Sequence, residues 1–247
     1  MNLGVIPARL ASTRFPGKML APLAGKPLVM HTYEQVRQAE LLDEVIIAVD
    51  DEQVQAVLEK FGAQVQLTAV EHQSGTDRAA EVSAGSDAAV VINIQGDEPL
   101  IDPRLIDDLL GVFTNQQVVM ATAAGRNLDT ADLLDSNVVK VFLDFDQTAV
   151  DFQRLVPDNL IGGCYRHIGI YAYRRDFLHT FTQLPPSENE RHRRLEQMRA
   201  LDNGFPVHCL LTDYRLLGVD TPEDLELVRS RLDTKPDAIT VERDDHK

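Results

Sequence analysis

The chain opens on the stretch Leu3-Gly4-Val5-Ile6-Pro7-Ala8-Arg9-Leu10-Ala11-Ser12-Thr13-Arg14-Phe15-Pro16-Gly17-Lys18. Its apolar beginning ends at Pro7 and gives way to a polar segment with the three cations Arg9, Arg14 and Lys18. A loop rich in Gly and Pro can turn backbone N–H groups toward phosphate oxygens, while Arg and Lys neutralise their charge. The stretch therefore predicts a strand followed by a polyphosphate-binding loop. A solvated basic loop after an edge strand has the same composition, so both interpretations stay open at this point.

Strand and helix patterns alternate after this loop. The β-branched run Glu44 to Val49 has the composition of a strand that is buried on both faces of a parallel sheet. Two strand–helix units within about seventy residues indicate an α/β fold with a doubly wound, mostly parallel sheet. The expected helices span residues 27–39, 51–61 and 103–113, and the further strands span 64–68, 88–94 and 118–124.

The pattern changes after residue 127. Strands are expected at 137–143 and 165–173 with no long helix between them, which predicts a small antiparallel excursion added at the sheet edge. Helices are expected at 191–201 and 222–232. We expect residues 1–232 to form one domain, whose excursion at about 136–205 contributes an acceptor site and a dimer contact. Residues 233–247 are polar and charged, and we expect them to form a flexible tail.

The charge balance narrows the class of protein. The 247 residues include 24 basic and 39 acidic side chains, which gives a formal net charge of −15 and argues against a nucleic-acid or anionic-membrane binder. Cys164 and Cys209 form no metal-ligand cluster, and buried free thiols in a reducing cytosol are expected. The absence of a signal-peptide pattern and of a long apolar run predicts a cytoplasmic protein without membrane insertion.

Several polar stretches fall where the strands of an open α/β sheet end. Asp97 directly follows the most continuous apolar strand, at the carboxyl edge where ligands of such sheets collect. A carboxylate at this edge, opposite the cationic loop, could hold Mg²⁺ on a nucleoside triphosphate. Helix capping is the alternative for Asp97 with Glu98, for Ser74 and for Asp220.

Two further segments contain candidate site residues. Alternation over 166–173 puts His167, Gly169 and Tyr171 on one face of a strand, opposite Ile168 and Ile170. A structural hydrogen bond is the common role of a single strand histidine, and Tyr171 on the same face favours a site. The arginines of the charged helix at 191–201 are interpreted as a solvated face.

Taken together, six stretches resemble the signature set of the CMP-Kdo synthetase family, the 3-deoxy-manno-octulosonate (Kdo) cytidylyltransferases of lipopolysaccharide synthesis. They occur in order across residues 1–232, and they are Ile6-Pro7-Ala8-Arg9 with Ser12, Arg14 and Pro16-Gly17-Lys18; His72-Gln73-Ser74-Gly75-Thr76 with Arg78; Gln95-Gly96-Asp97-Glu98-Pro99; Arg166-His167-Ile168-Gly169-Ile170-Tyr171; Leu195-Glu196-Gln197; and Val219-Asp220-Thr221-Pro222-Glu223-Asp224-Leu225. The opening loop is shared with other sugar nucleotidyltransferases, whereas six motifs in order are specific.

The resemblance implies the fold of the nucleotide-diphospho-sugar transferases and the transfer of CMP from CTP to an octulosonate, with release of pyrophosphate. It implies Mg²⁺ held by Asp97 and Asp220, catalytic roles for these two residues with Arg9 and Lys18, and a homodimer. The implied nucleotide site comprises Pro7, Ala8, Arg9, Arg14, Lys18, Ser74 and Arg78. The implied sugar site comprises Gln95, Arg154, His167, Tyr171, Glu196 and Gln197.

One segment departs from the family pattern. The family usually has Tyr-Phe-Ser-Arg followed by Ile-Pro and a longer loop, whereas this chain has Asp151-Phe152-Gln153-Arg154-Leu155-Val156-Pro157. One hypothesis is that Asp151 adapts the acceptor site to a modified octulosonate such as 8-amino-Kdo, by pairing with its ammonium group. The alternatives are another sugar acid, another nucleotide and, from a different class, a non-catalytic nucleotide-binding module.

Overall fold

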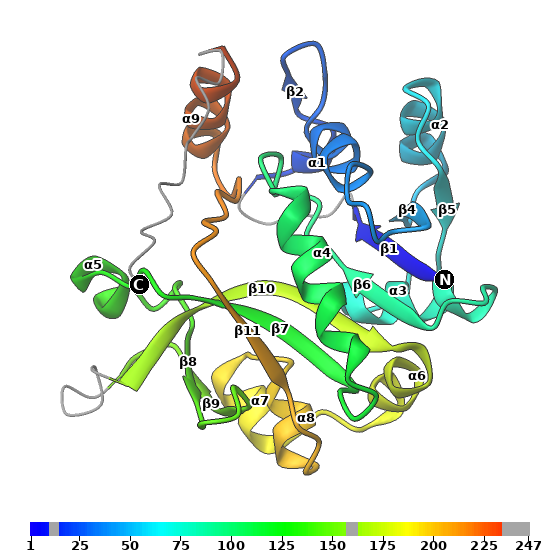
Figure 1. The fold of residues 1–247 in the computed structure, drawn as a ribbon. Helices are drawn as coiled ribbons and strands as arrows, with labels where there is room; N and C mark the ends of the chain where they lie inside the picture. The colour runs from blue at the N-terminus through cyan, green and yellow to red at the C-terminus, as the bar shows by residue number, and fades with distance from the viewer. Residues whose placement is uncertain (10–14, 157–162, 234–247) are drawn as a thin grey trace.

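The computed structural model describes residues 1–9, 15–156 and 163–233. Among these residues the chain forms one large mixed sheet with helices on both faces, together with a short β2–β3 hairpin at Pro22–Leu23 and Lys26–Pro27 (Figure 1). The main path through the large sheet has the order β11-β7-β10-β6-β1-β4-β5. These strands are β1 (Asn2–Pro7), β4 (Glu44–Val49), β5 (Val65–Leu67), β6 (Val90–Asn93), β7 (Met120–Gly125), β10 (Cys164–Arg174) and β11 (His208–Thr212).

The strand directions confirm the predicted mostly parallel α/β fold. Strands β5, β4, β1 and β6 run parallel to one another, and β7 runs parallel to β11. Strand β10 is antiparallel to both of its neighbours, β6 and β7. Along the described path, all strands except β10 therefore point the same way.

The prediction that the antiparallel segment lies at the sheet edge was wrong. Strand β10 lies in the middle of the sheet, between β6 and β7, and only the hairpin of β8 (Lys140–Leu143) and β9 (Ala149–Gln153) extends from it. The physical reason is burial on both faces, because Ile170 and Ala172 lie in one core cluster and Tyr173 lies in the other. Strand β9 was not predicted from the sequence.

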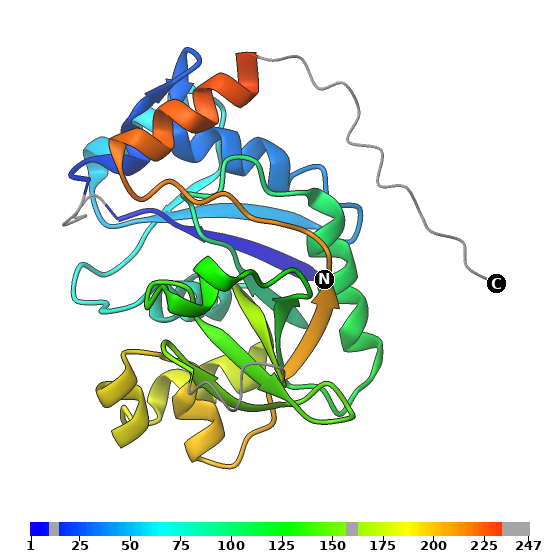
Figure 2. The ribbon, with the colours of Figure 1, turned by 90° about the vertical axis from the view of Figure 1, so that its left-hand side faces the viewer.

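Two apolar cores lie on opposite faces of the sheet, as a doubly wound fold requires. The first core is covered by the helices α1 (Leu28–Val36), α2 (Glu52–Lys60) and α4 (Pro103–Gly111). The second is covered by α3 (Gly75–Ala84), α6 (Arg175–Gln183) and α8 (Met198–Asp202). Leu3 packs in the second core and Ile6 in the first, because successive side chains of a strand point to opposite faces. Figure 2 shows the two helical layers from the side.

The predicted helix at 191–201 is interrupted. Helix α7 (Glu188–Arg193) ends at Arg194, whose φ of 56° is left-handed, and α8 begins only at Met198. The N–H of Leu195 donates to the carbonyl of Glu190 at 3.2 Å, which closes the turn. The Leu195-Glu196-Gln197 motif therefore lies in the break between two short helices, where its side chains can turn into the molecule.

The last described helix closes one side of the fold. Helix α9 (Pro222–Asp233) packs Leu225 and Val228 against Leu23 and Leu28, and both views place it beside the β2–β3 hairpin (Figures 1 and 2). A short helix α5 (Thr130–Leu134) was not predicted. None of the described helices is long and apolar enough to cross a membrane. The predicted flexible tail lies almost entirely outside the described residues.

Candidate active site

Lys18 connects three segments that are far apart in the sequence. Gly17 adopts a left-handed conformation, with φ of 70°, and leads into the 3-10 turn Lys18–Leu20. The Lys18 ammonium lies 2.5 Å from Oδ2 of Asp97 and 3.3 Å from Oδ1 of Asp220. Lys18 is buried and the side chain of Asp97 is 21% exposed, whereas that of Asp220 is 47% exposed, so water competes mainly at Asp220. Lys18 of the predicted cationic loop and the two predicted metal ligands thus meet at one point.

Backbone contacts hold this point together. The N–H of Val219, next to Asp220, donates to the carbonyl of Asp97 at 2.9 Å. Gly96 lies so close to the end of β1 that a Cβ would be 3.1 Å from the carbonyl oxygen of Pro7 and 3.2 Å from Sδ of Met19. Glycine therefore suits the close approach of the β1 and β6 ends, because a side chain here would crowd Pro7 and Met19.

The carboxylates of Asp97 and Asp220 fit a magnesium site that is completed by a substrate. Among the described residues, no group of three or more His, Cys, Asp or Glu side chains gathers in a way that could hold a metal ion by itself. Mg²⁺ in nucleotide sites is commonly bound by one or two carboxylates, with phosphate oxygens and water as the other ligands. Two aspartates beside Lys18 match this donor set.

Glu98 lies beside Asp97, and the sequence predicted only a capping role for it. Its Oε2 is buried without a hydrogen-bond partner among the described residues, and a Cβ on Gly218 would lie 3.0 Å from its Oε1. Burial and the neighbouring charges of Asp97 and Asp220 raise the pKa of Glu98 to about 8. The capping alternative fails here, since Asp102 caps α4.

The nucleotide-side residues of the opening loop take different positions. Ala8 is buried, and its N–H donates to the carbonyl of Ala48 at 2.8 Å. Pro7 packs against the beginning of α3, because a Cβ on Gly75 would lie 3.0 Å from Cγ of Pro7. Arg9 is exposed at the end of the strand. Arg14 lies outside the described residues, so its predicted role stays a prediction.

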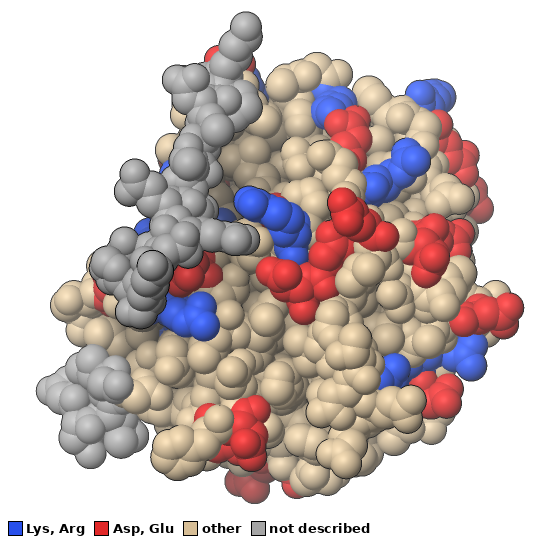
Figure 3. All heavy atoms as spheres, in the orientation of Figure 1, with Lys and Arg blue, Asp and Glu red and all other residues tan. Residues whose placement is uncertain are grey.

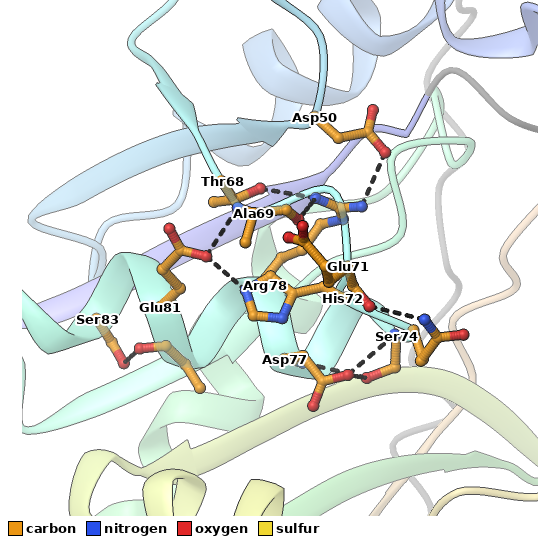
Figure 4. A network of polar contacts seen from close by, with 12 residues as sticks. Asp50, Thr68, Ala69, Glu71, His72, Ser74, Asp77, Arg78, Glu81 and Ser83 are labelled. Carbon is orange, nitrogen blue, oxygen red and sulfur yellow. Dashed lines mark hydrogen bonds and ion pairs between the residues drawn. The ribbon is translucent and has the colours of Figure 1, made fainter.

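Ser74 begins α3 with a reciprocal capping box. Its hydroxyl accepts from the N–H of Asp77 at 3.1 Å, and Asp77 in turn accepts from the N–H of Ser74 at 3.1 Å (Figure 4). The capping alternative is therefore confirmed for Ser74. A nucleotide contact by the same residue stays a prediction.

Arg78 makes three hydrogen bonds to neighbouring protein groups. Nη1 donates to Oγ1 of Thr68 at 2.8 Å and to the carbonyl of Ala69 at 3.0 Å, and Nη2 donates to Oδ2 of Asp50 at 2.8 Å (Figure 4). Asp50 follows β4 and Thr68 follows β5, so one buried guanidinium ties two strand ends to α3. The structure gives Arg78 a positioning task, whereas a direct nucleotide contact stays a prediction.

The candidate acceptor side lies on β10 and its neighbours. The ring of His167 lies 5.5 Å from that of Tyr171 and 5.1 Å from that of Phe152, measured between centroids. Nε2 of His167 is 3.0 Å from the hydroxyl of Thr122 on β7. Burial lowers the pKa of His167 to about 3 and raises the pKa of Tyr171 well above its ordinary value. Both side chains are therefore neutral at pH 7.

Glu196 and Gln197 turn inward from the break between α7 and α8. Oε2 of Glu196 accepts from the hydroxyl of Thr76 on α3 at 2.8 Å, and burial raises the pKa of Glu196. Gln197 is buried, and its Nε2 has no hydrogen-bond partner among the described residues. Gln95, in contrast, is exposed between β6 and Asp97.

Arg154 is held by backbone carbonyls, and its predicted sugar contact stays a prediction. Its guanidinium donates to the carbonyls of Ser136, Arg193 and Arg194 at 3.1 Å each. Asp151 pairs with the guanidinium of Arg193 and accepts from Nε2 of Gln153 at 2.7 Å. The carboxylate of Asp151 is thus already compensated, and the structure does not favour its use for a substrate ammonium group.

Comparisons with known proteins agree with this geometry. The cytidylyltransferase family profile matches residues 3–210. The chain is 43% identical to a 3-deoxy-manno-octulosonate cytidylyltransferase of Geobacter sulfurreducens, over 94% of this chain and 100% of that relative. It is 48% identical to the protein of the same name from Solibacter usitatus, over 93% of each chain.

A solved structure extends the similarity to three dimensions. The structure of CMP:2-keto-3-deoxy-manno-octonic acid synthetase complexed with CTP has a TM-score of 0.88 and 38% sequence identity. It covers 94% of this chain, and 98% of its own chain is matched. The chain therefore belongs to the cytidylyltransferase family, and within it to the group of the 3-deoxy-manno-octulosonate cytidylyltransferases, which are nucleotidyltransferase enzymes.

Proposed function

We propose that the chain transfers CMP from CTP to the anomeric hydroxyl of 3-deoxy-manno-octulosonate with release of pyrophosphate, and so activates the sugar for lipopolysaccharide synthesis. The observation that carries the proposal is the meeting of Lys18 with Asp97 and Asp220. Cations for a triphosphate and carboxylates for its metal are thereby brought to one edge of the sheet. The names of the relatives support CTP and an octulosonate as the two substrates.

The chain's own groups suit an in-line displacement at phosphorus. Attack of the sugar hydroxyl on the α-phosphate increases the negative charge on the phosphate oxygens, and the ammonium of Lys18 with the guanidinium of Arg9 can stabilise it. Asp97 and Asp220 would hold Mg²⁺, which supplies further charge stabilisation when it is bound. Neutral His167 and Tyr171 would orient the acceptor through hydrogen bonds.

A substrate screen tests the proposal. Pyrophosphate release is measured for CTP, UTP, GTP and ATP with 3-deoxy-manno-octulosonate, 8-amino-Kdo and related sugar acids, with and without Mg²⁺. Release with CTP and 3-deoxy-manno-octulosonate is expected to exceed release with every other pair and to require the metal. Absence of pyrophosphate with every pair would refute the enzymatic function and leave a non-catalytic nucleotide-binding module.

Substitution of one carboxylate tests the metal role. Asp97→Asn keeps the shape of the side chain and is expected to abolish turnover without unfolding the protein, because an amide is a weaker ligand for Mg²⁺. Asp213→Asn removes the same charge at an exposed position and serves as the control. Substantial Mg²⁺-dependent activity of Asp97→Asn would count against the metal role.

Assembly and location complete the proposal. Phe145 and Val150 are exposed on the β8–β9 hairpin, which supports a homodimer formed through this segment. Sedimentation that finds only a monomer would remove the dimer. On the face shown in Figure 3, basic side chains of the described residues are scattered among acidic ones, in agreement with small-molecule substrates rather than nucleic acid. A cytoplasmic location stays a prediction.

A further inference from the structure

Three buried polar atoms without hydrogen-bond partners lie at the end of β6 and in the break between α7 and α8. They are Oδ1 of Asn93, Oε1 of Glu196 and Nε2 of Gln197; none of them has a hydrogen-bond partner among the described residues, although Oε1 of Glu196 lies 3.8 Å from Nη2 of Arg199. Asn93 is the last residue of β6, whereas the other two lie in the break between α7 and α8. A buried polar atom without a partner costs free energy, so a group of such atoms points to a ligand or an ordered water that completes them.

Thr76 connects Asn93 and Glu196 through its hydroxyl. Oγ1 of Thr76 donates to Oε2 of Glu196 at 2.8 Å, and Nδ2 of Asn93 donates to the same Oγ1 at 3.5 Å. This direction of donation fixes the amide of Asn93, because Nδ2 must face Thr76. Oδ1 of Asn93 then points away from Thr76 and stays available as an acceptor.

Asn93 also lies beside the aromatic residues of the candidate acceptor side. It pairs with Tyr171 in the ladder between β6 and β10, and residues paired in this way have side chains on the same face. The ring of Tyr171 in turn lies against that of His167. Asn93 therefore belongs to the row of side chains that faces the acceptor, although the six motifs of the sequence analysis do not include it.

We propose that Asn93 is a further sugar-binding residue, whose Oδ1 accepts a hydrogen bond from a hydroxyl group of the octulosonate while Thr76 holds the amide in place. The inference rests on the proposed function. Oδ1 of Asn93 can only accept, so its partner must be a donor, and the hydroxyl groups of a sugar acid supply donors whereas its carboxylate does not. Nε2 of Gln197 can only donate and suits an oxygen of the same substrate.

The variant Asn93→Leu tests this contact, because leucine has a similar size and lacks the acceptor. We expect KM for the octulosonate to rise by about tenfold while KM for CTP stays within about twofold, as for the loss of one hydrogen bond. Ser83→Ala is the matched control, since it removes a buried hydroxyl from α3, the helix of Thr76, at a position where that hydroxyl bonds only to its own helix. Calorimetric titration with CTP provides a second readout, and equal affinity for wild type and Asn93→Leu is expected.

A series of monodeoxy octulosonates separates a direct contact from a positioning effect. The analogue that lacks the hydroxyl bound by Asn93 should bind wild type more weakly than the complete sugar does. Asn93→Leu should bind this analogue and the complete sugar equally well, because the contact is already absent. The proposal is overturned if every analogue loses affinity equally with both proteins, or if Asn93→Leu and Ser83→Ala have the same KM for the sugar. If Asn93→Leu does not fold, Asn93→Ser, which also removes the amide oxygen without adding bulk, is measured in the same way. Wild type that is inactive with every octulosonate would instead refute the proposed function itself.

Discussion

Removal of the buried Arg78 guanidinium should cost the protein more stability than any surface charge can contribute. Arg78→Met retains most of the apolar stem and deletes three hydrogen bonds, to Asp50, Thr68 and Ala69. It also removes the guanidinium with which the carboxylate of Asp50 forms an ion pair. Breaking a buried ion pair by deleting one partner typically costs about 3–5 kcal/mol.

The position of Asp50 decides where in this range the cost falls. The Arg78 side chain is 3% exposed and that of Asp50 is 18% exposed, so water can partly compensate the carboxylate that remains. We therefore expect a loss of about 3 kcal/mol in the free energy of unfolding. For a domain of this size, such a loss corresponds to a fall in Tm of about 6–12 °C. The N-terminus of α3 should loosen as well and raise KM for CTP, because Ser74 begins the same helix.

Urea denaturation at pH 7 measures the effect against two further variants. Arg104→Met removes an arginine that bonds to Asp102 at 2.6 Å but is exposed, and its urea midpoint should stay close to that of wild type. The double variant Asp50→Asn with Arg78→Met should regain part of the loss, because no uncompensated charge remains buried. If Arg78→Met and Arg104→Met shift the midpoint equally, the assignment of a stabilising role to the buried pair is refuted.

Two further substitutions, at His167 and at Gly96, test the burial of a side chain on β10 and the close approach of the β1 and β6 ends. Burial lowers the pKa of His167 to about 3, so between pH 6.5 and pH 3 the unfolded chain takes up a proton on His167 that the folded chain does not. The stability that neutral His167 contributes to the folded state above pH 6.5 is therefore lost as the pH falls. Between about pH 7.5 and pH 5 the loss amounts to about 2 kcal/mol of unfolding free energy. Urea titrations at several pH values in this range measure it for wild type and for His167→Gln, which lacks the titrating group. If both proteins show the same dependence of unfolding free energy on pH, the role of His167 is contradicted. Gly96→Ala should destabilise the folded protein by roughly 1–3 kcal/mol, because the added Cβ would crowd Pro7 and Met19. The control Gly85→Ala should be neutral, because a Cβ there has no neighbour within 4 Å. Equal melting temperatures of the two variants would argue against the close approach of β1 to Gly96.

Much of the fold could be predicted from local patterns, and the exceptions have physical causes. The strand Glu44–Val49 was predicted to the residue, because a continuous β-branched run between charged neighbours has few alternatives. The central place of β10 could not be predicted, since alternation within a strand states which faces are buried but not which strands lie beside it. The break at Arg194 was also missed, because a charged segment with helical composition does not reveal a left-handed residue.

The sequence predicted which residues lie in the site better than it predicted what each side chain contacts. Lys18 was identified in the cationic opening loop, Asp97 from its place after a strand and Asp220 from the family resemblance, and the structure brings the three together. Arg78 and Arg154 were predicted as ligand contacts, and the structure shows that both guanidinium groups bond to protein oxygens, while their ligand contacts stay predictions. The sequence cannot distinguish these tasks, because a guanidinium fork suits a carbonyl cluster and an anionic ligand equally well.

The end of β6 explains why both halves of the proposed reaction can meet. Asn93 faces the core that contains α3, and the chain then continues through Gln95 and Gly96 to Asp97, the proposed metal ligand. Gly96 lies against Pro7, so the end of β1 meets this segment between Asn93 and Asp97. A phosphate bound to Lys18, with Asp97 holding its metal, would therefore lie within a few residues of the proposed sugar-binding residue Asn93 along a single strand extension. Placement of both proposed substrate sites on one buried strand and its extension is the positioning that a direct transfer without a covalent enzyme intermediate requires.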